Sequence, residues 1–297
     1  MKIRANAKIN LTLDILGRRA DGYHDLATVM QSVALYDDVT VTLNDSGNIT
    51  VHTSSTQLKD DESNIAWKAA NAFFDASGLV GQGVSITIEK NIPMEAGMAG
   101  GSADGAAVIV ALNRLCGMNF DDAKLWDIGA TVGADIPFCI TGGTMLAEGK
   151  GEILTPLPLL ADFPDAPVIL LCKPEVGVST GKAYGAVDNC DPAVLGRLRP
   201  DTDAMCRALA ERNLPGVAKN VRNVFEEVMD IGECAAIKRI MTAEGALGAC
   251  MTGSGTTVFG LFDDAAKAEA CAARLRETFP RTYLTHAASA GCDMTSE

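Results

Sequence analysis

The stretch NIPMEAGMAGGSADGAA, residues 91–107, limits the fold more than any other part of the chain. It follows an alternating segment in which Val84, Ile86 and Ile88 share one face of a predicted strand. Behind it, residues 102–117 have the spacing of a small-residue helix. A strand, a glycine-rich loop and a helix in this order can turn several free backbone N–H groups toward an anion. Composition alone leaves two interpretations open: a phosphate-binding loop, or an ordinary turn before an alanine-rich helix.

Two better-known phosphate motifs do not match this chain. The segment GVSTGKAYG contains Gly181 and Lys182, but Val176 and Ala183 stand where a Walker loop needs glycine and serine or threonine. The segment TGSGTTV begins like a dinucleotide-binding motif, but Val258 takes the place of its last glycine. It also connects two predicted strands, so neither motif is predicted here.

The overall charge restricts the classes of ligand. The 297 residues are 47% hydrophobic, which suits one large or two medium domains with cores of their own. The formal net charge of −13 repels nucleic acid and anionic membrane surfaces. We therefore expect a small anionic ligand held with Mg²⁺, and neither a nucleic-acid nor a membrane partner.

Nine cysteines, an odd number without CxxC spacing, favour reduced core residues over a disulfide framework or a zinc site. The N-terminal residues alternate like a strand and lack the apolar core of a signal peptide. No apolar run reaches the roughly 18 residues that a membrane span needs. These features predict a cytoplasmic protein.

Periodicity predicts a chain of mixed strands and helices. Strands are predicted at residues 7–16, 37–43, 48–53, 83–91, 167–174 and 282–288, a strand–turn–strand unit at 246–262, and strands with tight turns at 134–157. Helices are predicted at residues 61–78, 102–117, 121–133, 201–213, 223–245 and 263–279. The proline-rich segment 157–167 marks a domain boundary, giving domains 1–158 and 159–297. Whether the last strand returns to the first domain stays open.

Three motifs carry a resemblance to a known family. Pro-x-x-x-Gly-Met-x-Gly-Gly-Ser before a small-residue helix, residues 93–102, is similar to the ATP-binding loop of the GHMP kinases. Residues 5–33, 133–152 and 251–262 resemble further blocks of that family in the same order, so the resemblance covers nearly the whole chain. Within the family, AKIN and DGYH resemble the branch that phosphorylates a cytidine-diphosphate-linked polyol on the route to isoprenoid precursors.

The resemblance implies an α+β fold of two domains. The N-terminal domain would be ribosomal protein S5 domain 2-like and the C-terminal domain a ferredoxin-like α/β sandwich, with the active site in the cleft between them. It implies transfer of the γ-phosphate of ATP to a substrate hydroxyl, with Lys8 and Asp135 as the catalytic pair. Taken singly, Lys8 could be a surface charge on an edge strand and Asp135 an ordinary turn residue.

The ATP side implied by the resemblance is the glycine loop with two further residues. Asn64 matches a position near the adenine, and a helix N-cap is an equally good interpretation of it. Lys90 matches a nucleotide contact, and its alternative is a solvated strand end. The implied ATP-binding residues are Asn64, Lys90, Pro93, Met94, Glu95, Ala96, Gly97, Met98, Ala99, Gly100, Gly101, Ser102 and Ala103.

The substrate side would bind cytidine through an imidazole and aromatic rings. Met30 stands where relatives often have an aromatic residue, which weakens the stack on the base. The implied substrate-binding residues are Asn10, Tyr23, His24, Met30, Tyr184, Thr252, Gly253 and Ser254. Apart from Asp135, no residue stands out as a firm Mg²⁺ ligand, and Ser102 is kept as a candidate.

Departures from the family pattern give specific backbone expectations. Ala99 and Ala103 replace a common glycine and serine, and we expect both to hold right-handed backbone angles. Glu95 should point to solvent, because a carboxylate aimed at a triphosphate would repel it. Alternatives to the leading interpretation are another GHMP kinase, a non-catalytic nucleotide-binding relative, and a cysteine-based carrier or redox protein. The chain could be a monomer or a homodimer.

Overall fold

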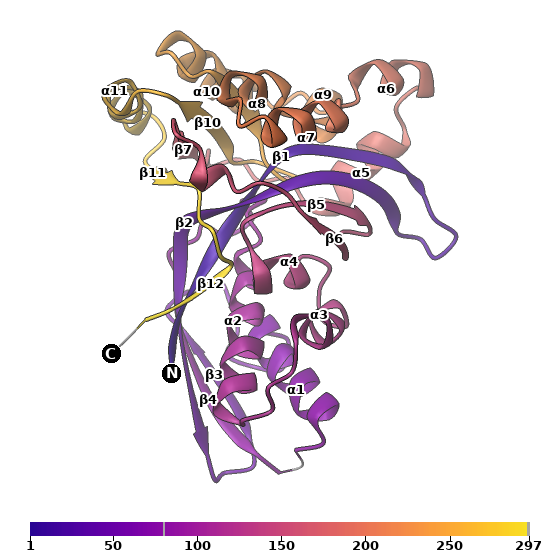
Figure 1. Ribbon diagram of the computed structural model, residues 1–297, viewed down its shortest axis with the longest axis vertical. Coiled ribbons are helices and arrows are strands. Elements are labelled where there is room, and N and C mark those ends of the chain that lie inside the picture. The colour runs from indigo at the N-terminus through magenta and orange to yellow at the C-terminus, as the bar shows by residue number, and fades with distance from the viewer. Residues whose placement is uncertain (80, 296–297) are drawn as a thin grey trace.

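The computed structural model describes residues 1–79 and 81–295 as two sheets with helical layers (Figure 1). The larger sheet has the order β12-β1-β2-β4-β3, with β5 and β6 continuing from β2 and β8 pairing with β1. Its strands are β1 Lys2–Arg18, β2 His24–Asn44, β3 Ile49–Thr53, β4 Gly83–Glu89, β5 Thr144–Gly149, β6 Ile153–Pro156, β8 Arg222–Asn223 and β12 Cys292–Met294.

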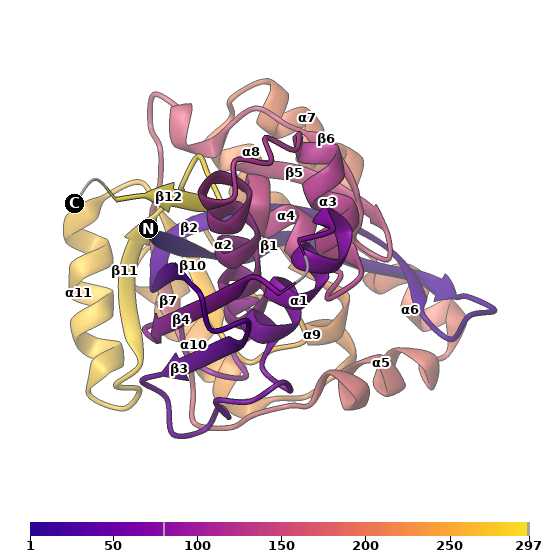
Figure 2. The ribbon, with the colours of Figure 1, turned by 90° about the horizontal axis from the view of Figure 1, so that it is seen from below.

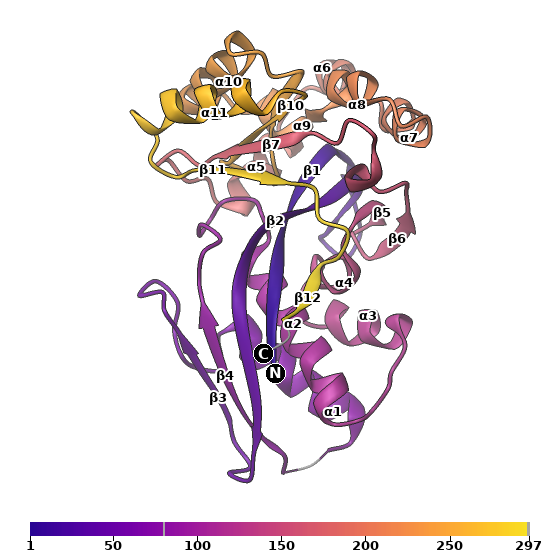
Figure 3. The same cartoon turned by 60° about the vertical axis from the view of Figure 1, so that its left-hand side comes forward.

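The long hairpin of β1 and β2 runs through both halves of the molecule (Figure 3). Every residue of β1 from Ala5 to Ile15 is buried, so this strand is covered on both faces rather than on one. Register shifts between Asn6 and Ala7, and between Asn10 and Thr12, bend the hairpin where it passes between the two halves. The predicted separate strand 37–43 is the second half of β2.

Four helices cover one face of the larger sheet: α1 Ile65–Ser77, α2 Gly100–Leu115, α3 Asp122–Ala130 and α4 Ile136–Thr141. Helix α2 buries every residue from Ala103 to Ile109. Its alanines let it approach β1 and β2 closely, and it packs against α1 and α4 on its other sides. The alanine-rich composition of α2 is therefore explained by burial on all sides.

The smaller sheet is antiparallel in the order β11-β7-β10-β9. Its strands are β7 Val168–Cys172, β9 Gly248–Met251, β10 Val258–Phe262 and β11 Thr282–His286. Seven helices follow β7 in this half of the chain, of which α8, α10 and α11 contact the smaller sheet, with α10 and α11 above it in Figure 3. They are α5 Thr180–Asp188, α6 Pro192–Leu198, α7 Thr202–Ala210, α8 Leu214–Asn220, α9 Val224–Val228, α10 Gly232–Ala243 and α11 Ala265–Arg276, and the 3₁₀ turn η1 Leu160–Asp162 precedes β7.

The two halves share a hydrophobic core. On β7, Ile169 and Leu171 belong to the core cluster of the larger sheet, whereas Leu170 and Cys172 belong to the cluster under α10 and α11. This alternation buries both faces of the smaller sheet. The C-terminal segment crosses back as well, because β12 pairs with β1 although β11 lies in the smaller sheet. The boundary at residue 158 stays a prediction.

Three parts of the predicted element pattern are wrong. Residues 136–141 form helix α4, with Pro137 in its first turn, where strands and turns were expected. The predicted helix 223–245 is broken, because Met229 is extended and α10 begins only at Gly232. Helices α5, α6 and α8 had no predicted counterpart, since each spans fewer than ten residues.

The described residues include no helix that is both long and apolar enough to cross a membrane. All nine cysteines are free, which confirms the expectation of reduced thiols. Burial raises the pKa of Cys172 to about 11 and that of Cys234 to about 12. Such thiols carry little thiolate at neutral pH, so these two positions do not favour a thiol-based activity.

Candidate active site

A cleft of about 430 Å³ lies between the two halves of the molecule. It is bordered by β1, β2, the glycine loop, the start of α4, the start of α5 and the turn between β9 and β10. Its lining residues are Lys8, Asn10, Leu13, Leu26, Thr28, Met30, Glu95, Gly97, Ala99, Asp135, Val178, Ser179, Thr180, Tyr184, Phe225, Gly253, Ser254 and Gly255. Both halves of the chain therefore contribute to one site.

Asn10 connects three of the segments that border the cleft. Its side-chain oxygen accepts hydrogen bonds from Lys8 Nζ at 2.7 Å and from the backbone N–H of Gly253 at 3.0 Å. Its backbone N–H donates to Thr252 Oγ1 at 2.9 Å, and its amide nitrogen donates to Thr28 Oγ1 at 2.8 Å. These bonds hold β1, β2 and the β9–β10 turn together, and they orient the buried Lys8 ammonium at the cleft wall.

Asp135 reaches the cleft from the position directly before α4. It is the N-cap residue of that helix, yet its side chain makes no capping hydrogen bond. In the described part of the chain, Lys8 bonds to Asn10 and makes no ion pair with Asp135. Burial and then the charge of Asp135 raise the pKa of Tyr184 on the opposite wall. The carboxylate is thus available to a ligand in the cleft.

The glycine loop meets the β9–β10 turn backbone to backbone. Gly97 has φ +72°, and a Cβ there would lie 2.3 Å from the carbonyl oxygen of Thr252. A Cβ on Gly253 would lie 2.6 Å from the oxygen of Gly97. Only glycine permits this approach at either position. The loop of the first half and the turn of the second half therefore form one continuous wall.

The conformation of the loop corrects one expectation and confirms another. Ala99 has φ +57° as the N-cap of α2, so the expected right-handed angle is wrong there. The loop must reverse direction directly before α2, and this requirement outweighs the strain of a Cβ at positive φ. Ala103 lies inside α2 with right-handed angles, as expected. Glu95 is exposed, but it also lines the cleft.

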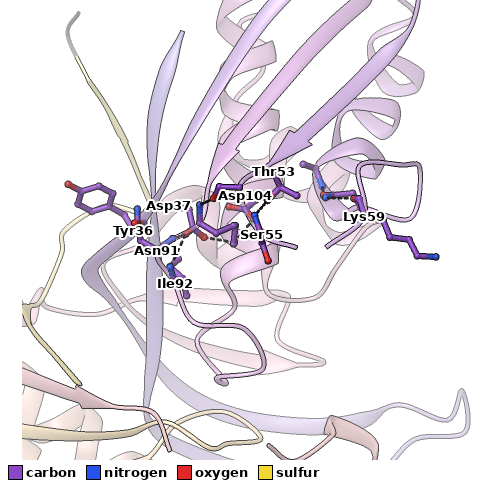
Figure 4. A network of polar contacts seen from close by, with 12 residues as sticks. Tyr36, Asp37, Thr53, Ser55, Lys59, Asn91, Ile92 and Asp104 are labelled. Carbon is purple, nitrogen blue, oxygen red and sulfur yellow. Dashed lines mark hydrogen bonds and ion pairs between the residues drawn. The ribbon is translucent and has the colours of Figure 1, made fainter. Parts of the chain in front are cut away.

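Behind the loop, Lys90 lies in a buried ion cluster with Asp37 and Asp104. Figure 4 labels the two aspartates. Its Nζ is 2.5 Å from Asp37 Oδ2 and 2.6 Å from Asp104 Oδ2, and none of the three side chains is more than 5% exposed. The second oxygen of Asp37 accepts the backbone N–H groups of Asn91 and Ile92, at 2.5 and 2.8 Å. The cluster ties the start of the loop and helix α2 to β2.

Two carboxyl groups share one ammonium in this cluster. Burial lowers the pKa of Lys90, but the charges of Asp104 and Asp37 outweigh burial and raise it. Burial raises the pKa of Asp104 to about 8 against the opposing charge of Lys90, with Asp37 adding to the rise. Asp104 Oδ1 is buried without a hydrogen-bond partner.

A direct nucleotide contact of Lys90 stays a prediction, because its ammonium is bound to Asp37 and Asp104 and Lys90 does not line the cleft.

Asn64 caps helix α1. Its side-chain oxygen accepts from the N–H of Ala66 at 2.9 Å, and its amide donates to the oxygen of Lys59 at 3.1 Å. A contact of Asn64 with adenine stays a prediction beside this capping role. Ser102 lies in the first turn of α2 and is half-buried.

The expected cytidine side contains an aromatic stack. The rings of His24 and Tyr184 are stacked with centroids 4.6 Å apart, and Phe225 meets Tyr184 edge-on at 5.0 Å. Tyr23 is 60% exposed and does not line the cleft, and the Lys150 ammonium lies 4.8 Å from the centre of its ring. Its role toward the substrate stays a prediction.

Met30 and the turn residues lie at the cleft, although the substrate roles predicted for them are untested. Met30 is 2% exposed and lines the wall. Thr252 is buried beneath Gly253 and Ser254, which line the cleft, and Ser254 Oγ lies 3.2 Å from Thr180 Oγ1.

The sequence did not predict several residues that line the cleft: Leu13, Leu26, Thr28, Val178, Ser179, Thr180, Phe225 and Gly255. Alternation along β2 from His24 to Met30 could have found Leu26 and Thr28.

The comparisons with known proteins agree with this geometry. A family model described as GHMP kinases N terminal domain matches residues 64–143, and one described as GHMP kinases C terminal matches residues 209–281. A protein of Acetivibrio thermocellus named 4-diphosphocytidyl-2-C-methyl-D-erythritol kinase is 44% identical, over 92% of this chain and 93% of the relative. A protein of the same name from Caldicellulosiruptor bescii is 43% identical, over 96% of this chain and 97% of the relative.

Solved structures support the same assignment. A crystal structure of 4-(cytidine 5'-diphospho)-2C-methyl-D-erythritol kinase superposes with a TM-score of 0.77 at 32% identity, covering 97% of this chain and 99% of that one. An L. major mevalonate kinase shares the fold, with a TM-score of 0.74 at 17% identity, covering 98% of this chain and 97% of that one. The expected two-domain α+β fold is thus confirmed. The chain belongs to the GHMP kinase family, within its branch of 4-diphosphocytidyl-2-C-methyl-D-erythritol kinases.

Proposed function

We propose that this chain transfers the γ-phosphate of ATP to the 2-hydroxyl of 4-diphosphocytidyl-2-C-methyl-D-erythritol, giving the 2-phosphate and ADP. The reaction belongs to the methylerythritol phosphate route to isoprenoid precursors, in the cytoplasm. The observation that carries the proposal is the single cleft that Lys8, Asp135, the glycine loop and the Tyr184 wall line together. Close relatives of known name support the choice of substrate.

In the reaction, the 2-hydroxyl oxygen attacks the γ-phosphorus, the bond from that phosphorus to the β,γ-bridging oxygen breaks, and ADP leaves. Asp135 accepts the hydroxyl proton, since its carboxylate does not cap its helix. Lys8, oriented by Asn10, supports the charge that develops on the transferring phosphoryl group. The N–H groups of residues 97–102 hold the phosphates at the start of α2.

Mg²⁺ fits this site as an ion held chiefly by nucleotide phosphates. The described residues contain no group of three or more histidine, cysteine or acidic side chains that could hold a metal alone. Mg²⁺ at kinase sites commonly binds one or two protein oxygens, phosphate oxygens and water. Asp135 and Ser102 would supply the protein oxygens, and the ion would neutralise phosphate charge beside an acidic protein.

The test is ADP release measured with ATP, with and without the cytidine-linked polyol, and with and without Mg²⁺. We expect turnover only when all three are present, and a new phosphomonoester signal in the ³¹P NMR spectrum of the product. ADP release that is independent of the polyol contradicts the proposal. Turnover with homoserine, mevalonate or galactose instead would point to another GHMP kinase, and ATP binding without turnover to a non-catalytic relative.

A further inference from the structure

A hydrogen bond connects the two halves of the chain at the substrate end of the cleft. His24 Nε2 lies 2.8 Å from Asp188 Oδ1, with side chains 9% and 35% exposed. His24 is the first residue of β2, and Asp188 is the last residue of α5. Figure 2 shows the β1–β2 hairpin projecting on the side of the molecule where α5 lies. None of the roles predicted above includes Asp188.

His24 continues the row of β2 side chains that line the cleft. Side chains two positions apart in a strand share a face, and Leu26, Thr28 and Met30 all line the wall. His24 is the next position of this row, and its ring stacks on Tyr184, which is a lining residue from the other half. His24 is not itself a lining residue, but through Tyr184 and Leu26 the imidazole lies next to the cleft wall, at the end of β2 away from the glycine loop.

The partner of Nε2 decides what the other nitrogen of His24 can do. A carboxylate only accepts hydrogen bonds, so a neutral imidazole facing it carries its proton on Nε2. Nδ1 then has a free lone pair and can only accept. Among residues 1–79 and 81–295, Nδ1 makes no hydrogen bond, and it is not among the buried polar atoms that lack a partner. It is therefore open to a ligand.

We propose that Asp188 is a specificity-determining positioning residue, which holds His24 as the Nε2–H tautomer so that Nδ1 accepts from the exocyclic amino group of cytosine. Uracil has a carbonyl oxygen in place of that amino group, so two acceptors would face each other and the base would be rejected. Asp188 acts through His24 and does not touch the substrate. The inference rests on the proposed cytidine-linked substrate.

The first test is the tautomer itself, measured without substrate. Long-range ¹H–¹⁵N NMR of ¹⁵N-histidine-labelled protein at about pH 8, above the ordinary titration range of imidazole, distinguishes the two tautomers. We expect His24 as Nε2–H. His52 provides an internal reference for the other tautomer. Its Nδ1 lies 3.0 Å from Asp60 Oδ2, so His52 should carry its proton on Nδ1. A His24 that is protonated on Nδ1, alone or together with Nε2, overturns the proposal.

The second test compares substrates in matched variants. In Asp188→Ala, the ratio of kcat/KM for the cytidine-linked substrate to that for its uridine-linked analogue should fall by about tenfold or more, mainly through KM. Asp188→Glu retains a carboxylate and should retain both the tautomer and the ratio. An equal loss with both substrates would mean that Asp188 has only a structural role, and a ratio that does not follow the tautomer would also overturn the proposal.

The two tests separate this inference from the proposed function. If the wild-type protein phosphorylates neither substrate, the proposed function fails while the tautomer measurement still stands. If it phosphorylates the cytidine-linked substrate but Asp188→Ala keeps the full ratio, only the inference fails. Circular dichroism and thermal melting check that the Asp188 variants fold.

Discussion

Replacing Asp104 by asparagine should change how stability depends on pH. The folded protein holds this carboxyl with a pKa raised from 3.8 to about 8, chiefly by burial. Between those two values the folded state keeps a proton that the unfolded state has lost. The contribution to stability is therefore complete below about pH 4, falls as pH rises, and is lost once pH passes about 8.

The structure gives the size of this effect. Where the folded group is protonated and the unfolded group is not, the free energy of unfolding falls by about 1.4 kcal/mol per pH unit. From about pH 5 to about pH 7 the wild-type protein should therefore lose about 3 kcal/mol from this group. Asparagine does not titrate, so the free energy of unfolding of Asp104→Asn should fall less steeply than that of the wild-type protein over this pH range.

Urea unfolding followed by tryptophan fluorescence is a suitable assay. The chain has two tryptophans, Trp67 in α1 and Trp126 in α3, and both helices pack beside α2. The fluorescence signal thus reports the half that contains Asp104, whatever the other half does. Parallel plots of unfolding free energy against pH for the two proteins would refute the reasoning. The test compares the slopes of these two plots and does not depend on the absolute stability of the variant.

Three further outcomes are expected. Asp135→Ala should fold normally, and its kcat, measured as ADP release, should be at least about a hundredfold lower. Near-normal turnover would mean that another residue is the general base. Gly97→Ala should lower the melting temperature and raise KM for ATP, because its Cβ would meet the Thr252 oxygen at 2.3 Å. Gly196→Ala is the control: a Cβ at Gly196 has no atom within 4 Å, so the melting temperature and KM should stay unchanged or improve. Ala99→Gly should raise the free energy of unfolding by about 1 kcal/mol, since Ala99 has φ +57°, and a destabilised variant would contradict the assigned strain.

The sequence predicts those parts of the site that depend on local chemistry. The strand–loop–helix order around the glycine loop follows from alternation, then glycine, then helical spacing, and the structure has all three. For Asn64 the sequence allows both a helix N-cap and an adenine contact, and the cap is present. The sequence places glycines in the loop and in the β9–β10 turn at the site, but it does not show why both are needed. In the structure Gly97 and Gly253 let the two backbones approach each other.

Features that depend on tertiary pairing could not be predicted. Lys90 directly precedes the loop, so its sequence position suggests a ligand contact, yet it is paired with Asp37 from a strand more than fifty residues earlier. Ala99 reads as an ordinary helical residue, since nothing local reveals that the loop must reverse there. The breaks around Met229 likewise arise from packing, because the surrounding residues have helical spacing.

The β1–β2 hairpin explains why one cleft can serve two ligands. On β1, Lys8 and Asn10 are two residues apart, and Asn10 bonds to the turn that closes on the glycine loop. On β2, Asp37 supports the start of that loop, while His24 lies at the substrate end of the same strand. A displacement of β2 would therefore move the loop support and the substrate wall together. We infer that this shared hairpin, rather than a linker between the halves, sets the distance between the two ligands.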